Sequence, residues 1–488
     1  MRCIVVLMSQ SSSSATTEDL SVTSTSNREP MLAGFPWVSA IILYTLSWGW
    51  SLLRPNTLYW DDWAYFESEF LELSADRREM GGSPLLTPVE ALIRLFGDWP
   101  MQVATFALFF FAGIFAFGIL RSVLSSRSQF LGSLTLIFLL APVNHARISR
   151  ICFPYSLSYF LFFLGWLILI NHHSLTKFLL SWTALLVSLS THSLLFFVLL
   201  PFLHFVWLNR DELKNSKKLR VVHVQVFLIA LLPITYLLLR KLFWPPTKDW
   251  TDYHQVTSAG LRVALLPIVI GLVPLVFIAM RKAKNLSVNF GLTLLVVGFL
   301  VTALALFPYF AGDLYVGYAG RPAYLTVFEF RADWRSRHQL LMPLGLALSV
   351  VGLNELFNWR KKNFVFVATV ALSVTLNMFW GSQYFLMSHK QEQLVELFAT
   401  TKNKIEIASV EDQAMQFNGR GASFRSYEWN GFMTLAEIST GRPGCEALPS
   451  GTALTLKSNT PYLKALVTRD LGLYFEVKPC SEVLAENG

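Results

Sequence analysis

Long apolar stretches recur along most of this 488-residue chain. They are continuous rather than alternating, and each is close to the ~20 residues that a helix needs to cross a bilayer. Because lipid offers no partner to an unpaired backbone group, such stretches must be helices. The pattern predicts eleven membrane spans, at about residues 35–53, 100–120, 129–143, 153–170, 176–191, 193–208, 222–243, 261–280, 288–309, 339–357 and 363–386.

Composition agrees with this pattern. Hydrophobic residues make up 53% of the chain and charged residues 15%, whereas soluble proteins carry about 25% charged residues. The mean hydropathy is +0.46. We therefore expect a mainly α, polytopic helical membrane protein.

The net charge of +8 has a simple explanation in such a protein, because cytoplasmic loops are enriched in Lys and Arg. There is no basic low-complexity arm, so nucleic acid is not an expected partner. Basic residues follow spans 2, 4, 6, 8 and 10, which places all of these loops on one side. We predict that this side is the cytoplasm, that the N-terminus lies inside, and that the tail lies outside a bacterial inner (cytoplasmic) membrane. These residues are Arg121, Arg127 and Lys177, and those in "NRDELKNSKKLR", "RKAK" and "NWRKK".

Three parts of the chain differ in character. Residues 1–34 are rich in Ser and Thr and are expected to be a disordered cytoplasmic N-terminus. Residues 35–386 form the transmembrane part, with a first outside loop at 54–99. Residues 387–488 read as a small extracytoplasmic α/β domain, since "SGTALTLKSN" and "DLGLYFEVKPC" alternate like half-buried strands and "KQEQLVELFATTKNKI" reads as a helix.

The tail contains two cysteines, Cys445 and Cys480. They lie on the side of the membrane where disulfides persist. We predict that they pair with each other.

An acid pair follows the first span, in the stretch "LYWDDWAYF" (58–66). An Asp at a helix start is an ordinary cap, and Trp and Tyr are the usual anchors at a membrane surface. Capping needs only one acid, however, and Asp61 and Asp62 beside a low-dielectric slab raise the cost of ionising both. The pair therefore also suits a general base, a metal site or an acceptor for a substrate hydroxyl.

The same loop contains "TPVEALIRLFGDW". This stretch puts Val89, Leu92, Ile93 and Phe96 on one helical face, with Pro88 near the first turn. The pattern predicts an amphipathic helix in the membrane interface. The acids are thus expected in a loop that lies on the membrane.

Basic residues also occur in loops on the predicted outside, against the charge rule. A single Arg there is most simply a side chain facing solvent or lipid headgroups. Three clusters in these outside loops favour an anionic ligand, because the guanidinium fork binds phosphate in a bidentate way. The candidate phosphate ligands are His145, Arg147, Arg150, Arg321, Arg335, Arg337 and His338.

These features together resemble the GT-C superfamily of integral-membrane glycosyltransferases, which use polyprenyl-phosphate-linked sugars. The stretch Asp61-Asp62-Trp63-Ala64-Tyr65 is similar to the acidic-acidic-x-x-Tyr pattern of the mannosyl- and aminoarabinosyl-transferase branch, and to the Asp-Asp motif of the arabinofuranosyl and O-antigen glucosyl branches. "SRHQLLMPLG" (336–345) resembles the basic segment that opens a late span. Trp63 and Ala64 stand where some branches have a basic residue, which leaves the branch and the sugar open.

The resemblance implies a glycosyltransferase that moves a sugar from a polyprenyl-phosphate donor to a cell-envelope glycan or lipid. Asp61 would take the proton of the acceptor hydroxyl. Asp62 would bond a substrate hydroxyl, ligate a divalent cation or cap the following helix. Metal dependence varies in the superfamily, and the sequence shows no convincing set of metal ligands. The resemblance therefore leaves open whether a divalent cation, Mg²⁺ or Mn²⁺, is a cofactor. Single displacement predicts inversion at the anomeric carbon, and membrane lipids are further partners.

Two other classes stay open. A transporter or flippase of a lipid-linked saccharide would show internal repeats and ionisable residues inside spans. The sequence shows no convincing repeat, and its charges cluster at span ends. A non-catalytic subunit of envelope polysaccharide assembly would use the acids only as caps, and Asp61→Asn would then leave activity intact.

Overall fold

The computed structural model describes the chain in segments separated by gaps. The predicted N-terminal segment 1–34 and span 261–280 lie wholly or mostly outside the described residues, as do Arg321, Arg335, His338 and Cys445. The described residues are 32–65, 70–79, 83–97, 99–124, 130–172, 174–191, 193–215, 221–245, 290–311, 336–337, 339–356, 364–401, 407–410, 426–436, 451–456 and 475–487.

Three helical stretches are long and apolar enough to cross a membrane, within the part of the chain that is described. They are α5 (Trp99–Val123), Arg150–Ile170, in which the 3₁₀ turn η6 (Arg150–Cys152) runs into α7 (Phe153–Ile170), and residues 364–389 of α18 (Phe364–Thr401). A fourth arises if α11 (Val221–Ala230) and α12 (Leu232–Phe243), which meet at 52°, form one broken span. The helices therefore have membrane-spanning character, while eleven spans and their topology stay a prediction.

Shorter apolar helices coincide with most of the other predicted spans. The predicted span 129–143 contains only a ten-residue helix, because Ala141 precedes Pro142 and is extended (ψ 125°). A residue before proline is disfavoured in the α region, so the helix ends at Leu140. The shorter apolar helices are α2 (Trp37–Trp48), α6 (Leu131–Leu140), α8 (Leu175–Ser188), α9 (Leu199–Leu208), α17 (Met342–Leu356) and residues 290–305 of α14 (Phe290–Ala311). The short polar helix α10 (Arg210–Asn215) follows α9.

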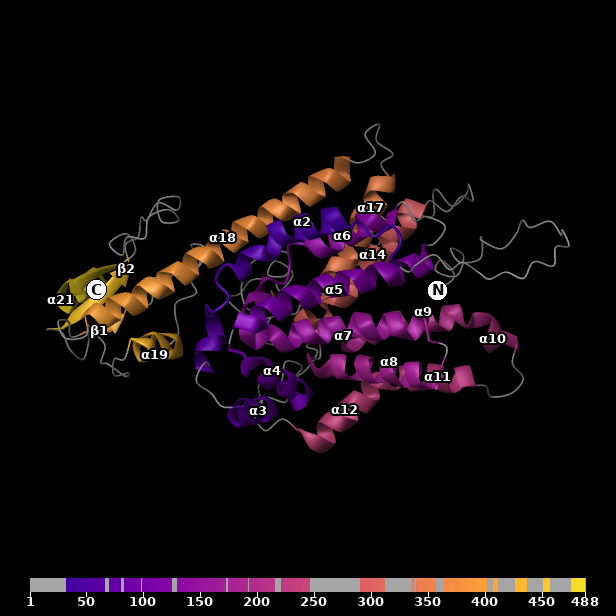
Figure 1. Ribbon diagram of the computed structural model, residues 1–488, viewed down its shortest axis with the longest axis horizontal. Coiled ribbons are helices and arrows are strands. Elements are labelled where there is room, and N and C mark those ends of the chain that lie inside the picture. The colour runs from indigo at the N-terminus through magenta and orange to yellow at the C-terminus, as the bar shows by residue number, and fades with distance from the viewer. Residues whose placement is uncertain are drawn as a thin grey trace.

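The helices pack side by side into one bundle (Figure 1). Its closest pair is α14 and α17, which meet through glycines at positions 291, 298, 345 and 352. A Cβ added to Gly352 would lie 2.6 Å from the backbone nitrogen of Leu295. Small residues let helix backbones approach this closely in membrane proteins.

The first loop carries short helices at one end of the bundle. These are the 3₁₀ turns η1 (Gly49–Leu52), η2 (Trp60–Ala64) and η3 (Pro84–Leu86), and the helices α3 (Phe70–Glu79) and α4 (Thr87–Arg94). On α4 and the turn after it, Val89, Leu92 and Phe96 are exposed, whereas Thr87 and Glu90 are buried. The helix predicted here is therefore present, and it turns apolar side chains outward.

Beyond its apolar part, α18 continues to a small sheet at the far end of the molecule (Figure 1). The strands β1 (Ile407–Val410), β2 (Thr452–Leu456) and β3 (Phe475–Pro479) lie in that order, with β1–β2 parallel and β2–β3 antiparallel. The tail also contains α19 (Ser426–Leu435) and α21 (Cys480–Asn487). Both predicted strands are thus present, while a separate extracytoplasmic domain stays a prediction.

Cys480 is buried and disulfide-bonded. Because Cys445 lies outside the described residues, the pairing of these two cysteines also stays a prediction.

Candidate functional site

The acid pair lies on the 3₁₀ turn η2, whose N-cap is Tyr59. Trp60, directly before Asp61, has φ 51°. An L-residue pays about 1–2 kcal/mol for this left-handed conformation, and a bulky side chain rarely adopts it. Asn144, at the start of the 3₁₀ turn η5 (His145–Ile148), has φ 58°. Such strain is kept only where the surroundings over-determine the backbone.

Asp62 is 4% exposed and accepts four hydrogen bonds. Its Oδ2 accepts from the backbone nitrogens of Tyr59 and Arg150, each at 3.0 Å. Its Oδ1 accepts from the Ser149 hydroxyl at 2.7 Å and from the backbone nitrogen of Ile151 at 2.8 Å. Asp62 therefore ties the first loop to the start of the long helix at Arg150, about ninety residues later in the chain.

Burial and hydrogen bonding shift the pKa of the Asp62 carboxyl in opposite directions. Burial raises the pKa of the Asp62 carboxyl above its ordinary value, and the four hydrogen bonds oppose that shift. All four partners are donors, which is the arrangement that suits a carboxylate. The N-terminus of the helix at Arg150 also favours a negative charge. Asp62 thus caps a helix, as one predicted alternative allowed, but that helix is not the one following it.

The segment 144–150 is held by a second predicted outside segment. The Gln339 side chain accepts from the backbone nitrogen of Asn144 at 2.9 Å, and the Ser336 hydroxyl accepts from that of Ala146 at 2.8 Å. The first loop, the segment around residue 147 and the opening of α17 therefore meet at one place.

The predicted phosphate ligands in this region do different things. The Arg150 guanidinium donates to the Asn56 carbonyl at 2.7 Å, which is a second tie to the first loop. Arg337 donates from Nε to the Tyr155 hydroxyl at 3.3 Å. Arg321, Arg335 and His338 lie outside the described residues.

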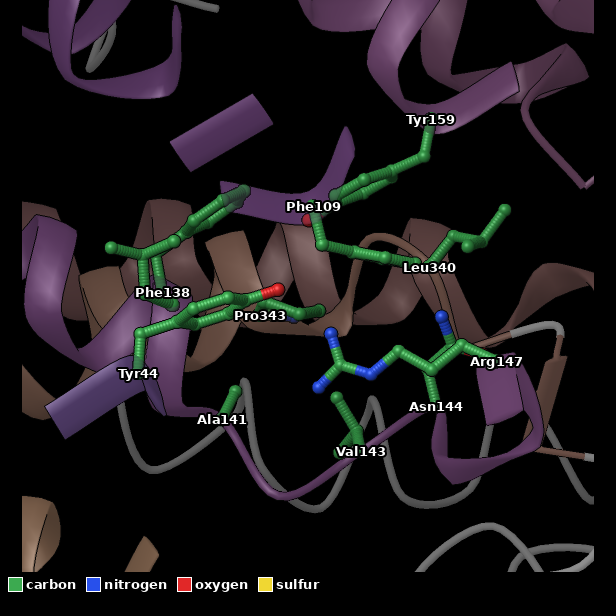
Figure 2. A pocket seen from close by; sticks show the side chains of 11 residues that line it. Tyr44, Phe109, Phe138, Ala141, Val143, Asn144, Arg147, Tyr159, Leu340 and Pro343 are labelled. Carbon is green, nitrogen blue, oxygen red and sulfur yellow. The ribbon is translucent and has the colours of Figure 1, made fainter. Parts of the chain in front are cut away.

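Arg147 instead reaches into the bundle. Its guanidinium carbon lies 3.1 Å from the ring centre of Trp48 and 4.6 Å from that of Phe109, and its Nε is buried without a hydrogen bond. Burial lowers the pKa of Arg147 to about 10. Figure 2 shows the guanidinium pointing into a cavity toward Tyr44.

Arg147 lines two small cavities that share Tyr44. Each has a volume of about 20 Å³, enough for about one water molecule. Neither can hold a sugar or a prenyl phosphate. Arg147 is therefore a partly buried cation whose Nε is shielded from solvent and whose attractive contacts are to aromatic rings.

His145 is 1% exposed and lies between Trp48 and Trp380, with ring centres 5.0 and 6.1 Å away. Burial, helped by the charge of Arg147, lowers the pKa of His145 to about 3. The Pro142 backbone opposes this shift only in part, and neither ring nitrogen makes a hydrogen bond of normal geometry. Burial therefore favours the neutral form of His145 in this arrangement, and its role as a phosphate ligand stays a prediction.

The C-terminal half of the chain covers the same loop. The Tyr59 hydroxyl donates to the backbone carbonyl of Tyr384 on α18 at 3.2 Å. The Tyr384 ring stacks on Trp50 at 5.2 Å and meets Trp60 edge-on at 5.8 Å. Arg54 forms an ion pair with Glu392, one turn beyond the apolar part of α18. No sequence pattern indicates these partners, except for the density of aromatic residues around the acid pair.

The site as described contains the backbone of Asp61 on η2 and the anchored side chain of Asp62. Within the described residues no group of three His, Cys, Asp or Glu side chains is placed to hold a metal ion, and both Asp62 oxygens are occupied by protein donors. The predicted Mg²⁺ or Mn²⁺ stays a prediction.

Comparison with known proteins places the chain in no group: no family model, curated protein or solved structure matches it.

Proposed function

We propose that the protein is a membrane glycosyltransferase that moves a sugar from a polyprenyl-phosphate donor to a cell-envelope glycan or lipid. The observation that supports this proposal is the fully bonded carboxylate of Asp62, which leaves Asp61 as the candidate base. Asp62 is fully used as an anchor, and the turn it anchors begins at a strained Trp60. Because strained, externally bonded backbone often serves to preorganise a functional group, we infer that this turn positions the other acid, Asp61, for catalysis.

The reaction needs one base and one place for a leaving anion. As the acceptor oxygen attacks the anomeric carbon, its proton passes to the Asp61 carboxylate and the new C–O bond forms. The bond from that carbon to the phosphate oxygen breaks, and its electron pair leaves with the lipid phosphate. General-base help is worth roughly 10²–10⁴-fold. A single displacement of this kind inverts the anomeric centre.

The leaving phosphate gains negative charge, which nearby guanidinium groups would stabilise. Of the described candidates, Arg150 and Arg337 are the ones beside the joined loops, while Arg147 lies in the bundle. We propose that the reaction occurs on the outer face of a bacterial inner membrane, where a lipid-linked donor presents its sugar. The apolar face of α4 would rest on that membrane.

The test is transfer of a radiolabelled sugar from polyprenyl-phosphate donors by purified protein in lipid vesicles. Asp61→Asn should lose transfer by about 10² or more while it still binds donor. Asp211→Asn is the matched control, because it removes an exposed carboxylate on α10. Undiminished transfer by Asp61→Asn would refute Asp61 as the base.

One observation favours a second function, that of a transporter for a lipid-linked saccharide. Ionisable residues inside a membrane bundle often mark a translocation path, and the guanidinium of Arg147 lines two cavities between the helices. A transporter would move a labelled lipid-linked saccharide across vesicles without breaking its sugar–phosphate bond, and Asp61→Asn would leave that movement intact.

A further inference from the structure

The tail of the chain contacts the acid-pair turn directly. Helix α19 (Ser426–Leu435) packs on η2 (Trp60–Ala64). The ring of Phe432 meets the ring of Trp63 edge-on, with centres 4.5 Å apart. Trp63 is 5% exposed and Phe432 is 0% exposed. The residue after the acid pair is thus buried against a helix nearly 370 positions later.

A glycine makes this close approach possible. A Cβ added to Gly431 would lie 3.1 Å from Cζ3 of Trp63 and nearer still to a neighbouring ring atom. Glycine inside a helix costs about 1 kcal/mol relative to alanine. At this position the missing Cβ is what lets the α19 backbone lie against the indole.

The turn that carries the acids cannot fix its own geometry. A 3₁₀ helix has poor hydrogen-bond geometry and rarely persists beyond a few residues, so contacts from outside must hold η2. Asp62 supplies one anchor, to residues 149–151. Trp63 supplies another, to α19. Successive side chains of a 3₁₀ helix leave it about a third of a turn apart, so these two anchors hold the turn from two different sides.

We propose that α19 is a positioning element of the acid-pair site, and that Phe432 acts on Asp61 through Trp63. The inference rests on the proposed function and gives the tail a role in it. Phe432 touches Trp63 rather than the reacting atoms, so it is a positioning residue. Its loss should release the turn and lower the rate of the chemical step, with little change in donor binding.

The experiment compares Phe432→Ala, the milder Phe432→Leu, and Leu435→Ala in the full-length protein in detergent. Leu435 lies on the same helix and is 49% exposed, so its variant is the matched control. The first readout is hydrogen exchange of a peptide covering residues 58–65, in which the amides of Asp62 and Tyr65 are bonded within the turn. The second is transfer from the labelled donor, with kcat and KM determined separately.

Phe432→Ala should speed exchange in 58–65 by about tenfold or more and lower kcat by roughly 10–100-fold, since a misplacement of about 1 Å can cost that much. KM for the donor should change less than about threefold, because only the base is displaced. Phe432→Leu should fall between Phe432→Ala and the wild type, and Leu435→Ala should match the wild type.

Three results would overturn the inference. Exchange in 58–65 that is unchanged in both Phe432 variants would show that α19 does not hold the turn. Faster exchange with an unchanged kcat would show that the contact is structural only. A rise in KM with constant kcat would assign α19 to substrate binding instead. If the wild type transfers no sugar, the proposed function fails, and the exchange readout alone decides whether α19 anchors η2.

Discussion

Replacing Asp62 by asparagine tests the buried anchor that joins the first loop to the helix at Arg150. The amide keeps one oxygen and exchanges the other for an NH₂ group. We expect the NH₂ to turn toward Ser149, because a hydroxyl can rotate and accept. The backbone N–H of Ile151, which bonds the same Asp62 oxygen at 2.8 Å, would then face a donor.

The size of the stability loss caused by Asp62→Asn follows from these contacts. One buried N–H without an acceptor costs about 1–3 kcal/mol. The remaining hydrogen bonds lose their charge assistance, which is about half of their strength. The neutral amide no longer carries the cost of a buried charge, which offsets part of these losses. The free energy of unfolding should therefore fall by about 3 kcal/mol in total. Unfolding entropy of ~2 cal/mol/K per residue over the chain converts this into a fall in Tm of about 3 °C.

The assay is thermal unfolding in one detergent at a fixed scan rate, because membrane proteins commonly unfold irreversibly. Ser149→Ala removes one of the four bonds and should lower Tm by about a third to a half as much. Asp211→Asn, whose side chain is 81% exposed, should leave Tm unchanged. If Asp62→Asn shifts Tm no more than Asp211→Asn, Asp62 is not an anchor.

Three further outcomes are expected. The pKa of His145 is about 3 in the folded protein and about 6.5 in the unfolded chain, so the folded state binds fewer protons between these pH values. The free energy of unfolding should therefore fall by about 2 kcal/mol from pH 7 to pH 5. The His145→Phe variant should lack this loss when its melting is followed against pH. Arg147→Met should raise Tm, because it removes a partly buried charge whose Nε makes no hydrogen bond. A lower Tm would show that the contacts to aromatic rings outweigh the cost of desolvating the charge. Gly352→Ala should destabilise the protein by about 2 kcal/mol, since its Cβ would meet the α14 backbone. Gly132→Ala is the control and should not destabilise it, because the nearest atom to its Cβ would be Pro36 Cγ at 3.9 Å. Equal melting temperatures for the two variants would contradict the packing argument.

Much of the helical architecture could be predicted from local patterns. Continuous apolar runs identified α5, α7 and α18, and the spacing of Val89, Leu92 and Phe96 identified α4. Alternation in the tail identified two strands. These elements are determined by residues near one another in sequence, which is the information that periodicity contains.

The details of the site could not be predicted in this way. Three of the four donors to Asp62 are backbone N–H groups, which every residue other than proline carries and no sequence pattern marks. The partners Tyr384 and Phe432 lie more than 300 positions from the first loop. Periodicity shows which face of a helix is apolar, but not which distant segment covers it. Arg147 was expected with the other outside basic residues and instead lies among aromatic rings of the bundle.

The central claim is that Asp61 acts as the base and Asp62 as a structural anchor. It is tested most directly by measuring sugar transfer and Tm together in Asp61→Asn and Asp62→Asn, with each rate expressed per folded molecule. The account predicts that Asp61→Asn melts like the wild type and transfers sugar at least about 10²-fold more slowly, whereas Asp62→Asn melts about 3 °C lower and loses transfer only in part. Full transfer by Asp61→Asn, or a wild-type Tm for Asp62→Asn, would contradict it.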